Sequence, residues 1–174
     1  MSDLRYPIGP FQKKPSISSQ ERDALIAHIA EVPVKLRAAV RSLSEPQIDT
    51  PYRPGGWSVR QVIHHVADSH MNSYIRFKLA ATETDPPIKT YQEALWAELP
   101  DARTAPVEHS LALIDALHFR WALHLRTLDE IDFRRTMIHP ANGVTTVDDL
   151  VQLYGWHGRH HTAHISELRA RMGW

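Results

Sequence analysis

Residues 107–128, VEHSLALIDALHFRWALHLRTL, hold the clearest structural pattern in the chain. Apolar side chains recur there in alternating steps of four and three residues, at Val107, Leu111, Ile114, Trp121, Leu125 and Leu128. On a helix this spacing gathers them on one face, as in helices that pack side by side. His118 falls on the same face, so we expect it to be a buried or half-buried core histidine. The pattern predicts one long helix of a bundle.

Three further segments have helical spacing of apolar residues, at about residues 18–44, 59–81 and 147–172. Each begins with a Ser or Thr followed three residues later by an acidic or amide side chain, an arrangement that caps the first turn of a helix. These capping pairs are Ser18 with Glu21, Ser58 with Gln61, and Thr146 with Asp149. Pro33 lies inside the first segment and should kink that helix or break it in two.

The connections between these helices are rich in proline and glycine. An irregular arm covers residues 1–17, and a long connection with four prolines, residues 84–106, contains one short helix at about residues 92–98. No segment predicts a strand, an internal repeat or a low-complexity region. We therefore expect an all-α protein with a single domain over residues 1–174, a four-helix bundle with long loops.

The composition excludes several classes of protein. Twenty basic and twenty acidic side chains cancel, so no overall field attracts nucleic acid or an anionic membrane. No apolar run is long enough to span a bilayer, and the first residues lack the apolar stretch of a signal peptide. We therefore expect a cytoplasmic protein. Because the chain contains no cysteine, any metal ion must be held by nitrogen and oxygen ligands.

The window YGWHGRHHTAHI, residues 154–165, contains four of the twelve histidines. On a helical wheel, His161 lies about 20° and His157 about 60° from the centre of the apolar face of the last helix. His164 lies near the margin at about 80°, and His160 is turned away at about 120°. His157 and His161, four residues apart, can therefore reach one metal ion from inside the bundle. His160 and His164 are expected to be solvated or to support the ligands from outside.

A metal site in a bundle also needs a ligand from a facing helix. The segment VIHHVADSH, residues 62–70, offers His64, His65, Asp68 and His70. His70 lies nearest the apolar centre of this helix, whereas His65 heads a polar row with Ser69, Asn72 and Arg76. That row is either a solvated face or the wall of a polar pocket. Apolar spacing alone favours His70, but it does not decide where the row lies.

Several stretches of the chain resemble the YfiT-like proteins of the DinB superfamily. The longest are PGGWSVRQVIHHVADSHMNSYIRFKLA at residues 54–80 and WHGRHHTAHISELRARMGW at residues 156–174. YPIGPF at residues 6–11, TPYRPGGW at 50–57 and LHFRW at 117–121 fit the same group, so the resemblance covers nearly the whole chain. It implies a four-helix bundle, a homodimer, and one divalent metal ion held by three histidines. Carried onto this sequence, the ligands are His65, in the stretch HHVAD, and the pair His157 and His161.

The resemblance implies a metal-dependent hydrolase, in which three histidines leave a position on the ion open for water or substrate. One alternative is a metal-dependent S-transferase, similar to bacillithiol transferases, that activates a low-molecular-weight thiol. A second is a non-catalytic metal-binding stress protein. Where HExxH sites carry a glutamate base, beside the first histidine of the pair, this chain has Gly158. Other candidate bases or partners of the ligands are Asp68, His64, His160 and His164.

The expected cofactor is one divalent ion per chain. Zn²⁺ is favoured because the site is rich in nitrogen, and Ni²⁺ is the alternative. The expected partners are a second copy of the chain and a small-molecule substrate, joined by a small thiol if the protein is a transferase.

Overall fold

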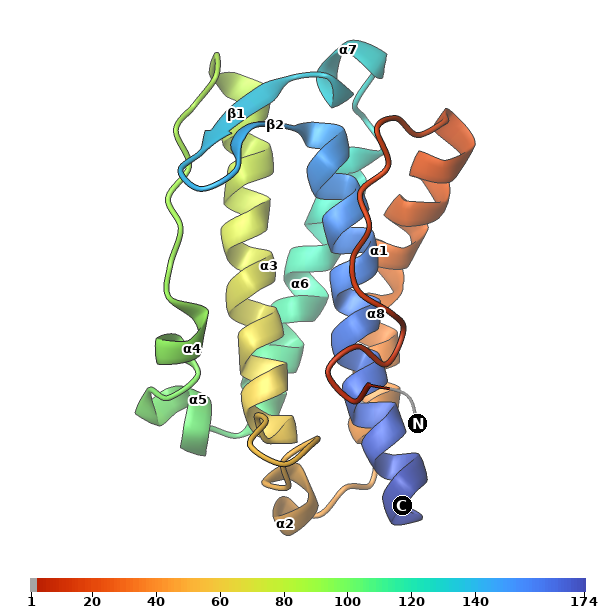
Figure 1. Cartoon of the computed structure of the whole chain (residues 1–174), viewed down its shortest axis with the longest axis vertical. Helices are drawn as coiled ribbons and strands as arrows, with labels where there is room; N and C mark the ends of the chain where they lie inside the picture. The colour runs from red at the N-terminus through yellow and green to blue at the C-terminus, as the bar shows by residue number, and fades with distance from the viewer. Residues whose placement is uncertain (1–2) are drawn as a thin grey trace.

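In this computed structural model, which describes residues 3–174, four long helices form a bundle (Figure 1). They are α1 (Ser19–Val40), α3 (Val59–Thr82), α6 (Val107–Leu125) and α8 (Val147–Met172). The predicted four-helix bundle with long loops is therefore confirmed. Two predicted helix ends were too late, because α1 ends at Val40 and α6 at Leu125. None of the described helices is both long and apolar enough to cross a membrane.

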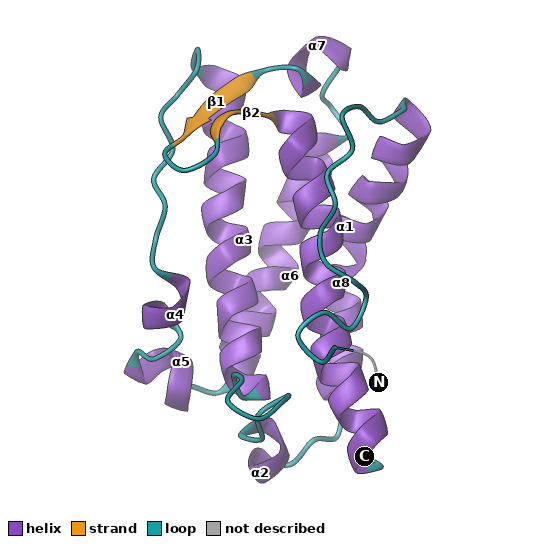
Figure 2. Ribbon diagram, in the orientation of Figure 1, coloured by secondary structure: helices purple, strands orange, loops and turns teal. Residues whose placement is uncertain are grey.

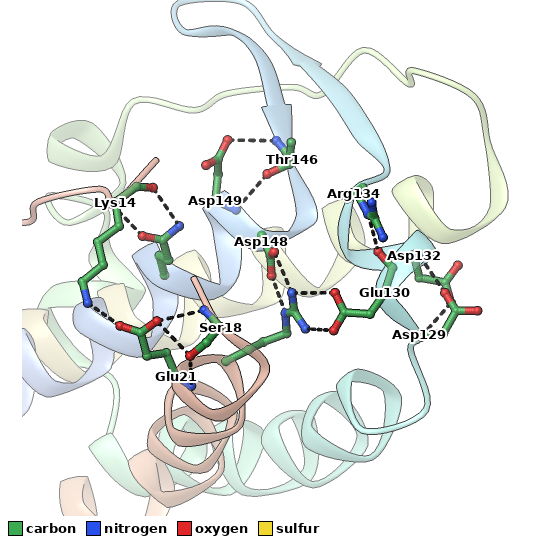
Figure 3. Close-up of polar contacts among 12 residues, drawn as sticks. Lys14, Ser18, Glu21, Asp129, Glu130, Asp132, Arg134, Thr146, Asp148 and Asp149 are labelled. Atoms are coloured by element: carbon green, nitrogen blue, oxygen red, sulfur yellow. Dashed lines mark hydrogen bonds and ion pairs between the residues drawn. The ribbon is translucent and has the colours of Figure 1, made fainter. Parts of the chain in front are cut away.

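The predicted capping pairs start three of these helices. Ser18, Ser58 and Thr146 each accept a hydrogen bond from the backbone amide three residues on, and the side chain at that position returns one to the cap. Figure 3 shows two of these boxes, Ser18 with Glu21 and Thr146 with Asp149. The helix α1 continues through Pro33, so the predicted break does not occur.

Short elements fill the connections. These are α2 (Glu45–Ile48), α4 (Glu93–Trp96), α5 (Pro100–Thr104), α7 (Glu130–Phe133) and the strands β1 (Thr136–His139) and β2 (Gly143–Thr146). The strands pair antiparallel from Thr136 opposite Thr146 to His139 opposite Gly143, and they lie where α3 ends and α8 begins (Figure 2). The prediction that the chain has no strand was wrong. Four-residue strands are too short for a clear alternation, although Asn142-Gly143 is a strong hairpin signal.

The core consists of two apolar clusters, one toward each end of the bundle. One cluster contains Val62, Val66, Ile114 and Ile165, and the other contains Phe77, Trp121, Leu125 and Tyr154. Between these positions, the same three helices carry buried histidines. A layer of histidine side chains therefore separates the two apolar halves of the core.

Candidate metal centre

The structure brings together the three histidines that the sequence predicts as metal ligands. His65 comes from α3, and His157 and His161 lie one turn apart on α8. One nitrogen from each ring lies within 4.8 Å of the others. The ring centroids of His65 are 5.5 Å from His157 and 4.8 Å from His161, and the two rings on α8 are 4.5 Å apart. His65 and His161 are buried and His157 is partly exposed.

The other histidines of α3 lie outside this cluster. Both ring nitrogens of His64 are engaged, Nδ1 with Ser110 Oγ at 2.7 Å and Nε2 with the Ala105 carbonyl at 3.0 Å. His70 is fully buried behind the cluster, and its Nε2 lies 2.9 Å from Nδ1 of His157. Apolar spacing correctly placed His70 toward the core, where its ring contacts the candidate ligand His157. His118 is 1% exposed, which confirms the prediction of a core histidine.

A second triad shares one member with the first. His160, His161 and His164 also offer nitrogens within 4.8 Å of one another. Of the two roles expected for His160 and His164, the solvated one is wrong, because they are only 7% and 2% exposed; support of the ligands from outside stays a prediction. His160 stacks on Trp156 with ring centroids 4.2 Å apart, and His164 stacks on Tyr52 at 4.0 Å.

The N-terminal arm explains the burial of these two rings. Figure 1 shows the arm running along α8. The arm covers a row of side chains on α8 spaced four residues apart: Gln152, Trp156, His160 and His164. Gln152 accepts a hydrogen bond from the Lys14 amide at 2.8 Å, Trp156 Nε1 donates to the Gly9 carbonyl at 3.2 Å, and His164 Nε2 donates to the Arg5 carbonyl at 3.1 Å. The helical wheel turned His160 away from the bundle and placed His164 at the margin, but the arm shields both rings from water.

Burial also sets the charge of these groups. It lowers the pKa of His65 to about 4, with a smaller contribution from the charge of His164. Burial, followed by the charges of neighbouring histidines, lowers the pKa of His157 and His161 well below the ordinary value. The three imidazoles are therefore neutral at pH 7, the form in which histidine binds a metal. His161 Nδ1 is buried and has no hydrogen-bond partner, so the donor set fits a bound cation.

A glycine follows His157 because α1 lies against α8 there. A Cβ atom at Gly158 would fall on the Cγ2 methyl of Val32 and would lie 3.3 Å from Cγ1 of the same residue. Position 158 therefore faces a neighbouring helix. An acidic side chain, as in HExxH sites, has no room there without moving α1.

Asp68 is the carboxylate nearest in sequence to a candidate ligand. It lies three residues after His65, so the two side chains are neighbours on the surface of α3. Burial, and to a smaller degree the charge of Asp101, raises the pKa of Asp68 to about 6. This carboxyl group exchanges its proton closer to neutral pH than an ordinary aspartate.

Comparison with known proteins places this arrangement in a family. The sequence model of the DinB superfamily matches residues 28–165. Proteins of Bacillus cereus strain B4264 and Bacillus mycoides strain KBAB4, each named "putative metal-dependent hydrolase", are 53% identical over 174 residues, which is the full length of both chains. The solved structure of YfiT from Bacillus subtilis, described as "a probable metal-dependent hydrolase with an unusual four-helix bundle topology", is 52% identical. It covers 98% of each chain with a TM-score of 0.95. TT2238, a four-helix bundle protein with 20% identity and a TM-score of 0.55, shares the fold.

Proposed function

The chain belongs to the DinB superfamily, and we propose that it is a metal-dependent hydrolase whose divalent ion is bound by His65, His157 and His161. The observation that carries the proposal is the convergence of three neutral imidazoles from two helices. Three protein ligands leave a coordination position open, as in catalytic sites, whereas structural sites are closed by four. Zn²⁺ is the proposed ion, with Ni²⁺ as the alternative, because both suit imidazole ligands.

The residues of the site suit hydrolysis in two ways. A divalent ion held by these residues would activate water near neutral pH and would polarise a substrate oxygen. Neutral histidines leave the full charge of such an ion available to the substrate, which carboxylate ligands would reduce. We propose Asp68 as the proton acceptor, because it lies one turn along α3 from His65 and a pKa of about 6 suits proton transfer near neutral pH.

Ligand variants test the metal site. His65→Ala, His157→Ala and His161→Ala should each lose most of the zinc that the wild-type protein retains after dialysis, as measured by mass spectrometry. His160→Ala is the matched control, since it removes a neighbouring buried imidazole that belongs only to the second triad. Zinc loss in His160→Ala and His164→Ala, with retention in His65→Ala and His157→Ala, would move the site to the second triad. Full zinc loading without all three proposed ligands would end the proposal.

One observation favours a second function, metal-dependent transfer of a small thiol. Val32 occupies the space where a side chain at residue 158 would begin, so the base found in HExxH sites is excluded. A thiol bound to a metal ion is already deprotonated, and a transferase therefore has less need of a base. The chain has no cysteine, so the thiol would be a cosubstrate.

The two functions differ in what they require. Zinc-loaded and metal-free protein should be assayed on activated esters and amides, and on a chlorinated nitrobenzene with several thiols. A hydrolase needs no thiol, its rate rises with pH through an apparent pKa near neutrality, and Asp68→Asn lowers kcat without changing the zinc content. Conjugation that depends on both thiol and metal, with no ester or amide turnover, would replace the hydrolase by the transferase.

A further inference from the structure

Three histidines, His118, His70 and His157, connect the backbone of α1 to the candidate metal centre. His118 Nδ1 lies 2.6 Å from the Ile29 carbonyl oxygen, and His118 Nε2 lies 2.8 Å from His70 Nδ1. His70 Nε2 lies in turn 2.9 Å from His157 Nδ1. His70 and His118 are 0% and 1% exposed, so neither ring exchanges these partners for water. The row spans α1, α6, α3 and α8 in that order.

The carbonyl at one end determines the position of every proton in the row. A carbonyl oxygen only accepts, so His118 carries its proton on Nδ1 and presents an unprotonated Nε2. His70 must then donate from Nδ1, which leaves its Nε2 as an acceptor. His157 consequently donates from Nδ1, and its Nε2 is the nitrogen with a free lone pair. If the hydrogen bonds between the rings ran in the opposite direction, His118 would have to carry protons on both nitrogens and would be charged. No carboxylate in the described chain hydrogen-bonds to any of the three rings to balance such a charge.

The Ile29 carbonyl is available because of the proline inside α1. In a helix this carbonyl would accept from the amide four residues on, but that residue is Pro33, which has no N–H. A buried carbonyl without a donor is costly, and His118 supplies the missing donor from α6. Pro33 therefore leaves one backbone carbonyl free to accept the hydrogen bond from His118.

We infer that His118 and His70 are positioning residues, which fix the tautomer and the orientation of His157 so that its Nε2 is presented to the metal. The inference rests on the proposed role of His157 as a ligand. A histidine ligand whose other nitrogen donates a hydrogen bond is held in place and made more basic. In this chain the hydrogen-bond acceptor is a second imidazole, itself fixed by a third, where most metal sites use a carboxylate or a carbonyl.

The proton positions can be measured directly on the full-length protein after removal of metal by a chelator. Nitrogen NMR of ¹⁵N-histidine-labelled protein distinguishes a protonated ring nitrogen from an unprotonated one. We expect His118, His70 and His157 to be protonated on Nδ1 and unprotonated on Nε2 at pH 7. A His157 protonated on Nε2 in the wild-type protein would overturn the inference, whatever any variant does.

Two substitutions at one position test the effect on the metal. His118→Gln keeps an N–H for the Ile29 carbonyl and an oxygen that accepts from His70, whereas His118→Leu removes both. We expect His118→Leu to raise the zinc dissociation constant about 10- to 100-fold, the usual effect of losing a partner of a metal ligand. His118→Gln should restore both the wild-type affinity and the Nδ1-protonated form of His157.

The outcomes separate this inference from the proposed function. Wild-type zinc affinity and an unchanged His157 tautomer in His118→Leu would overturn the positioning role and leave the metal site intact. An equal loss of affinity in the Gln and Leu variants, with the His157 tautomer unchanged in both, would show a packing effect and also overturn it. If the tautomers are as expected but His157→Ala still binds zinc at wild-type affinity, the error lies in the proposed ligand set.

Discussion

Replacing Gly158 with alanine tests how closely α1 and α8 approach each other at the histidine layer. The added Cβ atom would fall on the Cγ2 methyl of Val32, and it would lie 3.3 Å from Cγ1 of Val32 and 3.4 Å from Cε1 of His70. Val32 is β-branched and lies within a helix, where such side chains are held in one rotamer, so it cannot turn aside. Because Val32 cannot turn aside, overpacking should cost about 2–3 kcal/mol, the upper part of its usual range, and the better helix propensity of alanine returns about 1 kcal/mol. We expect Gly158→Ala to lower the free energy of unfolding by roughly 1–2 kcal/mol.

Urea denaturation of the metal-free protein, followed by circular dichroism, measures this change. Gly155→Ala is the matched control on the same helix, because its closest contact would be Cδ2 of Leu25 at 2.7 Å, the far end of a flexible side chain, with the fixed Cβ of Leu25 farther away at 3.1 Å. The decrease in the free energy of unfolding should be smaller for Gly155→Ala than for Gly158→Ala. The double variant Val32→Ala/Gly158→Ala should lose less than the sum of its single variants, since Val32→Ala removes the methyl groups that clash.

A Gly158→Ala protein as stable as the wild type would refute this reasoning, and so would strictly additive losses in the double variant. Either result would mean that α1 can move away from α8 at small cost. Position 158 could then accommodate a longer side chain, and its exclusion of an acidic base would no longer favour a thiol cosubstrate.

Three further predictions concern stability and assembly. Burial, opposed by the hydrogen bond to the Ile29 carbonyl, lowers the pKa of His118 from 6.5 to about 4. As the pH falls, His118 therefore gains its proton in the unfolded chain before it does in the folded chain. The stability that neutral His118 contributes above pH 6.5 is lost as the pH falls toward 4. Protonation of His118 in the unfolded chain should lower the free energy of unfolding by about 2 kcal/mol between pH 7 and pH 5. Urea denaturation should show a weaker dependence on pH for His118→Gln. Arg22 is 5% exposed and donates to Asp148 at 2.6 Å and Glu130 at 2.5 Å; Figure 3 shows both carboxylates joined by dashed lines to one guanidinium group. Arg22→Ala should lower the free energy of unfolding by about 1–3 kcal/mol in the same assay, because the carboxylates left behind are solvent-accessible, whereas the exposed Arg134→Ala should change it by less than about 0.5 kcal/mol. We propose that the chain forms the homodimer that the family resemblance implies, so light scattering at micromolar concentration should give about twice the 19.9 kDa of one chain, and a monomer mass would contradict it.

The helices and their starts were predictable because their signals are local. A capping pair is complete within four residues, and a long apolar stripe identifies the buried face of a helix without reference to its neighbours. The proximity of His157 and His161 follows in the same way from their spacing of four on one helix. The hairpin carried an Asn-Gly signal too, but its strands are too short for the alternation that identifies a strand.

The rest of the site depends on contacts between distant segments. Apolar spacing favoured His70 over His65, because it measures distance from the core and does not identify the ring that faces a neighbouring helix. The burial of His160 and His164 depends on an irregular arm whose course along α8 has no periodic signal. The reason for a glycine at residue 158 lies in Val32, more than a hundred residues away in the sequence.

The proline within α1 has an evolutionary consequence. Pro33 leaves the Ile29 carbonyl without its helical donor, and His118 provides one from another helix. A descendant that replaced Pro33 would regain an ordinary helical bond and relax selection on residue 118, whereas one that first lost His118 would bury an unpaired carbonyl. Across homologues, positions 33 and 118 should therefore change together, although 84 residues separate them in the sequence. An alignment of homologues would thus show coupled changes at two distant positions, caused by one amide hydrogen that proline lacks.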